Sequence, residues 1–243
     1  MNIDVKLAPQ SPEVWGDKDK TVVVIDVLRA SSTIITALEN GARAVVPVLT
    51  PDEAVTLKSR YDSENVLLGG ERGGLKVQGF DLGNSPLEYK KEVVEGKTIV
   101  FTTTNGTNAI RQSGSADNLL IGAYLNLEAV VKKALELDKD ILLFCAGRQN
   151  GFALEDAACA GAFCAAVLRM AQVKESDSAK AARMIAASFD STFASFMASE
   201  HGQLLERLGF SDDLKLAATF NSCKAVPISI NGQLVLSNTK KPR

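Results

Sequence analysis

The segment TVVVIDVLRASST, which runs from Thr21 to Thr33, combines an aspartate, an arginine and three consecutive hydroxyl residues. An apolar, β-branched run predicts a buried strand from Thr21 to Val27, with Asp26 near its end. Arg29 follows, and we expect a helix from Ser31 to Glu39. A carboxylate, a guanidinium and the free N–H groups of a helix start suit a phosphate group and its metal ion.

Two further segments repeat the order of strand, polar turn and helix, namely FTTTNGTN and FCAGRQNGF. Open α/β sheets bind ligands outside the carboxyl ends of their strands. If the three strands are parallel and near each other, one crevice receives Asp26, Arg29, Thr102 to Asn105, and Arg148. Guanidinium groups suit bidentate contacts with phosphate or carboxylate, and carboxylates hold a hard cation such as Mg²⁺.

A glycine-rich segment, GGERGGLKVQGFDLGNSP, lies between these motifs and carries further polar groups. Its six glycines predict a long irregular loop rather than regular structure. Loops of this length in compact domains are usually functional or disordered. Its charged residues, among them Glu71, Arg72 and Asp81, favour a functional loop.

Each of these residues also has a purely structural interpretation. Asp26 could cap the following helix, and the threonines from 102 to 104 could be ordinary strand residues. Arg148 could pair with Glu155 or Asp156, two acids that a helix start favours in any case and of which at most one would face the site.

The remaining candidate residues also have a structural interpretation. Glu71 and Asp81 could be solvated loop charges, and a single histidine such as His201 is more often structural than catalytic. One histidine and four cysteines without ligand spacing argue against a zinc site.

Several phosphate-handling and hydrolase templates are excluded by spacing. The chain has neither a G-x-x-x-x-G-K-[ST] loop nor a G-x-S-x-G elbow. A cysteine phosphatase needs an arginine six positions after its cysteine, where Cys145 has Gly151. The D-x-D signature that follows a strand in haloacid dehalogenases is half present, because Leu28 stands two positions after Asp26.

Composition places limits on the class of protein. The chain has 243 residues, 46% of them hydrophobic, and a net charge of −2, which argues against a nucleic-acid partner. No apolar stretch approaches the roughly 18 residues of a membrane span, and the first 20 residues lack a secretory pattern. We therefore expect a cytoplasmic protein that binds neither nucleic acid nor membrane; a homodimer is compatible with the sequence.

Strand and helix patterns alternate over the first 170 residues, which predicts an α/β architecture. Capping patterns predict helices that begin at Thr50-Pro51 and at Ser85-Pro86, the second ending near Gly96. Mostly helices follow, including one from Thr192 to Leu208, and Asn231-Gly232 marks a hairpin. We expect a single domain over residues 1–243, with αβα layers, a mixed and largely parallel sheet, and a helical C-terminal part ending in that hairpin.

Four motifs in the same order, IDVLRASSTI, GERGG…GFDLGNSP, FTTTNGT and CAGR…EDAACAG, resemble the 2-phosphosulfolactate phosphatase family. The resemblance runs from about Val22 to Gly161 and continues more weakly through SEHGQLLERLGF. It implies Mg²⁺-dependent hydrolysis of (2R)-2-phospho-3-sulfolactate to sulfolactate and phosphate, in a route to coenzyme M. Rival interpretations are a phosphatase of another phosphorylated 2-hydroxy acid and a non-catalytic anion-binding protein.

The resemblance suggests a role for each candidate residue. Asp26 is either a nucleophile or a Mg²⁺ ligand, and Arg29 stabilises the charge of the phosphoryl group. His201 is a weaker candidate for protonating the leaving alkoxide. The remaining assignments are as follows: Glu71 and Asp81 complete the metal shell, Ser31, Ser32, Thr103 and Asn105 bind phosphate oxygens, and Arg72 and Arg148 bind the other anionic groups of the substrate.

Overall fold

The computed structural model describes residues 1–9, 18–60 and 63–237. The strands are β1 (Asn2–Lys6), β2 (Lys20–Ile25), β3 (Ala44–Pro47), β4 (Val66–Arg72), β5 (Leu75–Lys76), β6 (Thr98–Thr102), β7 (Asn118–Gly122), β8 (Asp140–Cys145), β9 (Lys174–Glu175), β10 (Pro227–Ile230) and β11 (Gln233–Leu236). The helices are α1 (Ala30–Glu39), α2 (Pro51–Lys58), α3 (Lys91–Val94), α4 (Gly106–Gln112), α5 (Leu127–Glu136), α6 (Leu154–Met170), α7 (Asp177–Ala187), α8 (Thr192–Ala198), α9 (Glu200–Arg207) and α10 (Ser211–Ala217). Short 3₁₀ turns are η1 (Ser63–Asn65), η2 (Pro86–Glu88) and η3 (Tyr124–Asn126).

One mixed sheet organises these elements, in the order β5-β4-β6-β3-β11-β10-β7-β2-β8-β1-β9. Parallel pairing joins β4, β6 and β3 on one side, and β7, β2, β8, β1 and β9 on the other. The α/β class and the mixed, largely parallel sheet are therefore confirmed.

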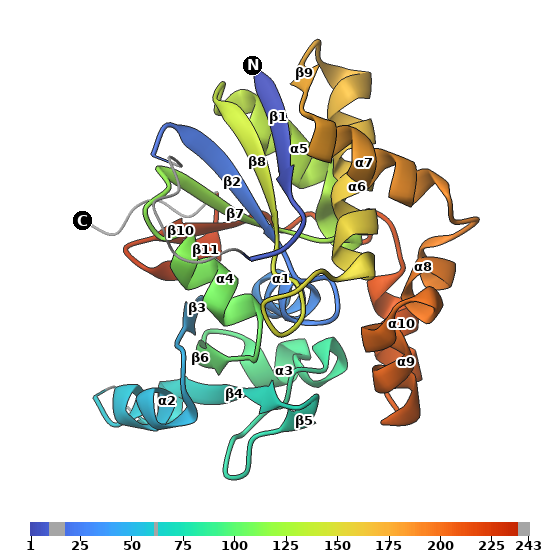
Figure 1. Ribbon diagram of the computed structural model, residues 1–243. Helices are drawn as coiled ribbons and strands as arrows, with labels where there is room; N and C mark the ends of the chain where they lie inside the picture. The colour runs from blue at the N-terminus through green and yellow to red at the C-terminus, as the bar shows by residue number, and fades with distance from the viewer. Residues whose placement is uncertain (10–17, 61–62, 238–243) are drawn as a thin grey trace.

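The C-terminal hairpin lies inside the sheet, between the two parallel groups (Figure 1). Its turn residues Asn231 and Gly232 have φ values of 52° and 79°, which confirms the two-residue hairpin. Antiparallel pairing links β3 to β11, β11 to β10 and β10 to β7. Three consecutive reversals leave the two parallel groups running in opposite directions.

The condition that all three site strands be parallel is therefore not met. β2 and β8 are parallel neighbours, but β6 belongs to the group that runs the other way. Only one residue pair joins the hairpin to each group, Leu234 with Val45 and Ile228 with Leu120. This limited pairing lets the groups turn relative to each other, and Figure 1 shows β4 lying across the region toward which β2 and β8 run.

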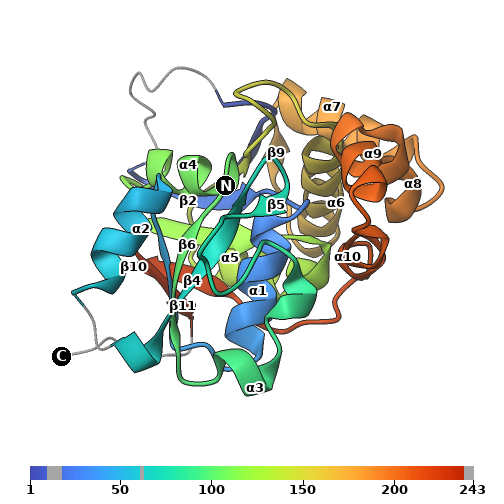
Figure 2. The same ribbon diagram turned by 90° about the horizontal axis from the view of Figure 1, so that it is seen from below.

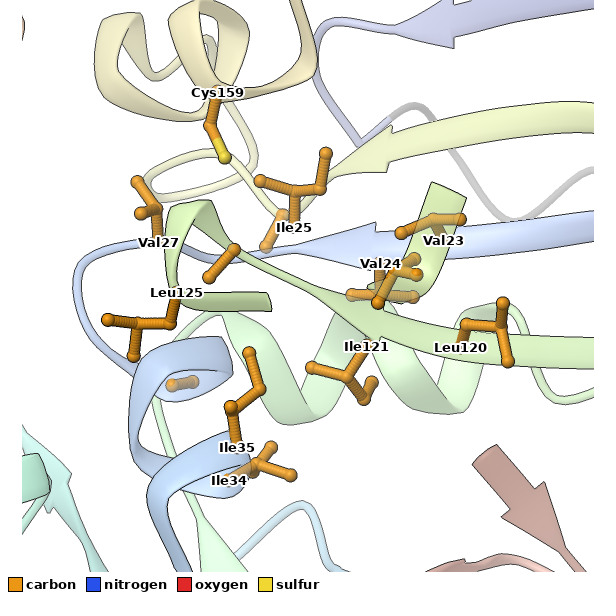
Figure 3. Close-up of a cluster of buried hydrophobic side chains, with 14 of the residues drawn as sticks. Val23, Val24, Ile25, Val27, Ile34, Ile35, Leu120, Ile121, Leu125 and Cys159 are labelled. Atoms are coloured by element: carbon orange, nitrogen blue, oxygen red, sulfur yellow. The ribbon is translucent and has the colours of Figure 1, made fainter. Parts of the chain in front are cut away.

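Helices cover both faces of the β2 region. Ile34 and Ile35 of α1 pack on one side of β2, and Cys159 of α6 packs on the other (Figure 3). Helices α8, α9 and α10 form a separate column beside α6, seen in orange and red in Figures 1 and 2. Among the described residues, no helix is both long enough and apolar enough to cross a membrane.

Two of the predicted helices differ from the structure. Thr50 caps α2 as expected, since its Oγ1 accepts a hydrogen bond from the Glu53 N–H. Ser85 does not cap a continuous helix, because its hydroxyl donates to Asp213; the 3₁₀ turn η2 and the short helix α3 take that place. The helix predicted from Thr192 to Leu208 is broken at Ser199, as described below.

The glycine-rich segment is also more ordered than the sequence suggested. β4 continues to Arg72 and pairs with β5 across a turn at Gly73 and Gly74, where φ is 62° and 87°. Glycine adopts these left-handed values without steric cost, so the same residues that argued against regular structure make a tight hairpin.

Candidate active site

A cavity of about 110 Å³ lies where the carboxyl ends of both strand groups meet. The β2 and β8 side supplies Asp26, Arg29 and Arg148. The opposite side supplies Glu71 from β4, and Thr104 and Asn105 from the turn after β6. The three strand-turn-helix segments thus reach one site, through two sheet groups that point toward each other.

Asp26 lines this cavity and is 6% exposed. Its Oδ1 accepts a 3.3 Å hydrogen bond from the Ala30 N–H at the start of α1. Burial, with smaller contributions from the Glu71 and Glu155 carboxylates, raises the pKa of Asp26 to about 6, although His201 and the Ala30 N–H act in the opposite direction. A Cβ at Gly106 would lie 2.7 Å from Asp26 Oδ2, so glycine lets α4 approach this carboxylate.

Arg29 lines the cavity, but its guanidinium is engaged by other protein groups. It pairs with Asp213 of α10 at 2.6 Å, both side chains being 2% exposed, and donates to the Gly74 carbonyl at 2.6 Å. The Cζ atom of Arg29 also lies 3.9 Å from the centre of the Phe210 ring, a cation–π contact. The predicted charge-stabilising arginine is therefore already neutralised by an acid, and it joins α1, the β4–β5 turn and α10.

Glu71 is a buried carboxylate that fixes the cavity wall. Its Oε2 accepts from the Gly74 N–H at 2.8 Å, and its Oε1 accepts from the Thr104 N–H at 2.7 Å. These bonds join the β4–β5 turn to the turn after β6. The solvated-charge interpretation of Glu71 is therefore wrong, because the side chain is 7% exposed and hydrogen-bonded on both oxygens.

His201 reaches the cavity from the first turn of α9, and the break between α8 and α9 places it there. Ser199 is extended, its hydroxyl donates to the Phe196 carbonyl, and it accepts from the Gly202 N–H. A Cβ at Gly202 would collide with the Phe196 carbonyl, so this sharp turn needs glycine. The His201 Nδ1 lies 3.1 Å from Glu155 Oε1, which orients the imidazole ring.

Arg148 stands between the first cavity and an adjoining one of about 320 Å³. It begins a tight turn in which Gln149 and Asn150 have φ values of 52° and 62°, and hydrogen bonds in both directions with Gly151 close the turn. The Asn105 side chain accepts from the Gln149 N–H at 3.1 Å, which holds the turn beside α4. Arg148 pairs with Glu200, which is 88% exposed, so a bound anion can replace this partner.

Five of the candidate residues lie outside the lining of the 110 Å³ cavity. The Ser31 and Ser32 hydroxyls donate to the main-chain carbonyls of Val24 and Val27, and the Thr103 hydroxyl accepts from the Thr107 N–H. Such local bonds are usual for hydroxyls at strand and helix ends.

The two loop candidates are also committed elsewhere. Arg72 donates to the carbonyls of Glu71 and Leu49 and to the Thr102 hydroxyl. Asp81 pairs with Lys58 at 2.9 Å and accepts from the Leu68 N–H, and these groups lower its pKa although burial acts to raise it. This placement is at odds with Asp81 as a metal ligand, and we correct that assignment.

The site also contains residues that sequence reasoning left undecided or unassigned. Glu155 and Asp156 are both buried, and Asp156 accepts from the Val27 and Gly147 N–H groups, which ties the ends of β2 and β8 together. Burial, followed by the nearby Asp26 and Glu155 charges, raises the pKa of Asp156 well above its ordinary value. Asn84 and Gln149 line the cavity as well; their only signal in the sequence was a polar residue within a motif.

Most of the cation ligands that the cavity offers are oxygens, with His201 as the one imidazole in its lining. Asp26 and Glu71 bring carboxylates, and Asn84 Oδ1 is buried without a hydrogen-bond partner in the described part of the chain. Within those same residues, no three His, Cys, Asp or Glu side chains form a ready metal cluster. Two carboxylates with neutral oxygens fit Mg²⁺, which keeps waters and substrate phosphate in its shell.

Buried acids near the carboxyl ends of strands, with a histidine on α9 that a carboxylate orients, are the groups typical of an active site in an α/β enzyme. Residues 8–232 match the family described as 2-phosphosulpholactate phosphatase. The chain therefore belongs to that family, whose name denotes a phosphoric monoester hydrolase.

Relatives named "Probable 2-phosphosulfolactate phosphatase" match over nearly the full chain. The protein of Thermotoga petrophila is 46% identical over 235 residues, covering 96% of this chain and 98% of its own. That of Clostridium acetobutylicum is 39% identical over 236 residues, covering 97% and 100%. That of Caldanaerobacter subterraneus is 41% identical over 216 residues, covering 88% and 90%.

Proposed function

We propose that this chain is a Mg²⁺-dependent phosphatase of 2-phosphorylated hydroxy acids, with (2R)-2-phospho-3-sulfolactate as its first candidate substrate. The observation that supports this most is the cavity that joins Asp26, Glu71, His201 and Arg148, in a chain of the phosphatase family. The products are (2R)-3-sulfolactate and phosphate. A role in coenzyme M synthesis, a cytoplasmic location and a homodimer stay predictions from the sequence.

Asp26 is the group we place at the reacting phosphorus. With a pKa of about 6, most of its carboxyl groups are ionised at neutral pH, and Oδ2 accepts none of the hydrogen bonds formed among the described residues. As a nucleophile, Oδ2 attacks phosphorus while the bond from phosphorus to the substrate's C2 oxygen breaks, and water then releases phosphate. As a metal ligand, Asp26 instead positions the cation, and water attacks directly.

Mg²⁺, when bound, neutralises phosphate charge and lowers the pKa of a coordinated water. Asp26 and Glu71 are the carboxylates we assign to hold it. Glu71 accepts one N–H on each oxygen and keeps further lone pairs, so a cation and these bonds are compatible. The same bonds keep the carboxylate in place before the cation arrives.

His201 is the group we assign to the leaving alkoxide. Glu155 binds Nδ1, and His201 lines both cavities, so we assign the other ring nitrogen, Nε2, to the substrate. A proton carried there passes to the C2 oxygen as its bond to phosphorus breaks. Glu155 acts through His201 and is a positioning residue in this scheme.

Arg148 is the cation we assign to the substrate's carboxylate or sulfonate. Its partner Glu200 is exposed, whereas Arg29 is held by a buried acid, so only Arg148 of the two exchanges partners at small cost. The adjoining cavity is lined in part by the apolar residues Phe152 and Ala198. These residues support a second candidate substrate, a phosphorylated hydroxy acid with a larger and less charged tail.

The experiment is phosphate release from a panel of 2-phosphorylated hydroxy acids with MgCl₂, for the wild type, Asp26→Asn and Asp81→Asn. We expect Asp26→Asn to lose at least about 100-fold in kcat, because it removes the nucleophile or ligand charge. Asp81→Asn should keep its activity, since Asp81 lies outside the cavity. Activity of Asp26→Asn within a few-fold of wild type would overturn this role; a trapped phosphoenzyme would identify the nucleophile.

A further inference from the structure

Asn84 has an unusual side chain for a buried residue, because its Oδ1 accepts no hydrogen bond from any described residue. The residue is 6% exposed and lines the cavity that holds Asp26 and Glu71. Burying an amide oxygen away from water costs free energy if no other group hydrogen-bonds to it. An oxygen left in this state inside a site therefore points to a ligand that binds it.

The main chain around Asn84 is held firmly. The Thr33 hydroxyl donates to the Asn84 carbonyl at 2.9 Å, and the Tyr89 hydroxyl donates to the Gly83 carbonyl at 2.7 Å. The Ser85 hydroxyl donates to Asp213 at 2.6 Å. Hydrogen bonds to Thr33 of α1, to Tyr89 and to Asp213 of α10 therefore hold residues 83 to 85 in place, at a point where Asn84 lines the cavity.

The position of this oxygen distinguishes it from the other unpaired ones. In the described residues, Thr21 Oγ1, Gln112 Oε1 and Ser113 Oγ are also buried without partners, but none of these residues lines the cavity. Gln112 thus provides a matched comparison, an unpaired amide oxygen outside the site.

The chemistry of the cavity indicates what Asn84 binds. A carbonyl oxygen accepts a proton donor or a hard cation, and the cavity already has two carboxylates, Asp26 and Glu71. Mg²⁺ takes about six oxygen ligands, so two carboxylates leave room in its shell for the oxygen of a neutral side chain. We propose that Asn84 Oδ1 is a Mg²⁺ ligand together with Asp26 and Glu71, an inference that rests on the metal dependence in the proposed function.

The test measures Mg²⁺ binding without substrate, by calorimetric titration of MgCl₂ into the wild type, Asn84→Leu and Gln112→Leu. Asn84→Leu should weaken the Mg²⁺ Kd about ten-fold or more, whereas Gln112→Leu should leave it unchanged. Thermal unfolding in EDTA supplies a second signature. Asn84→Leu should unfold at or above the wild-type midpoint, because it removes an unpaired oxygen, and it should lose most of the midpoint rise that MgCl₂ gives the wild type.

Asn84→Asp keeps the shape and an oxygen donor, so it tests the assignment if the leucine variant does not fold. We expect its Mg²⁺ Kd to equal or improve on that of the wild type. An unchanged Kd in Asn84→Leu, or a raised KM with unchanged Mg²⁺ binding, would assign Asn84 to the substrate and overturn the proposal. No Mg²⁺ binding by the active wild type would overturn both this inference and the metal part of the proposed function.

Discussion

Replacing Asp213 with asparagine should destabilise this protein strongly, although Asp213 lies on a short helix far along the chain from the site. Its carboxylate is the counter-charge of Arg29, and both side chains are 2% exposed. Asparagine keeps the shape but leaves the guanidinium charge buried without an acid. Loss of one partner of a buried pair costs about 3–5 kcal/mol.

For a chain of this length, a loss of that size lowers the unfolding midpoint by roughly 6–20 °C. Urea unfolding followed by circular dichroism gives the change in the free energy of unfolding directly. Glu136→Gln is the matched control, because its pair with Lys133 is exposed and should be worth less than about 1 kcal/mol. A change below about 1 kcal/mol for Asp213→Asn would refute the conclusion that Arg29 is held by this acid.

Three further predictions concern the site. Because the folded-state pKa of Asp26 is raised from 3.8 to about 6, the ionised carboxylate opposes folding, and its penalty grows as pH rises through that window. In EDTA, Asp26→Asn should therefore be more stable than wild type by up to about 3 kcal/mol at pH 7 and equal to it near pH 4; parallel stability curves would contradict this. Glu155→Gln should lower kcat roughly ten-fold or more with little change in KM, since Glu155 orients His201; a change confined to KM would count against a positioning role. Arg148→Ala should raise KM roughly ten-fold or more with kcat nearly unchanged, and Arg148→Lys should recover part of the loss; an unchanged KM for every ester would remove Arg148 from substrate binding.

Local signals in the sequence were sufficient for most elements. The β-branched run before Asp26, the Thr50-Pro51 cap and the Asn231-Gly232 turn each depend on neighbouring residues. The cap and the turn are found as predicted, and the strand is present but ends at Ile25 rather than at Val27. The Ser85-Pro86 cap failed because a distant acid, Asp213, takes the serine hydroxyl. A local pattern carries no information about such a competing partner.

The break at Ser199 is a second feature that the local sequence pattern did not predict. The residues from Thr192 to Leu208 have a continuous helical pattern, but Ser199 caps a new helix and Gly202 permits close contact with the Phe196 carbonyl. The site depends on this break, because it turns His201 toward Glu155.

What the sequence by itself determined is the set of chemical groups: Asp26, Glu71, Asn105, Arg148 and His201 all reach the cavity from the motifs that singled them out. What only the tertiary structure decided is how they meet and which are free to act. The final hairpin enters the middle of the sheet and leaves two strand groups that run in opposite directions, yet their carboxyl ends face one cavity. Asp213 neutralises Arg29 and Lys58 pairs with Asp81, while Asn84 Oδ1, in the cavity that Asp26 and Glu71 also line, has no hydrogen-bond partner among the described residues. The reason is that strand order, burial and pairing are set by residues far apart in the chain, and no local spacing encodes them.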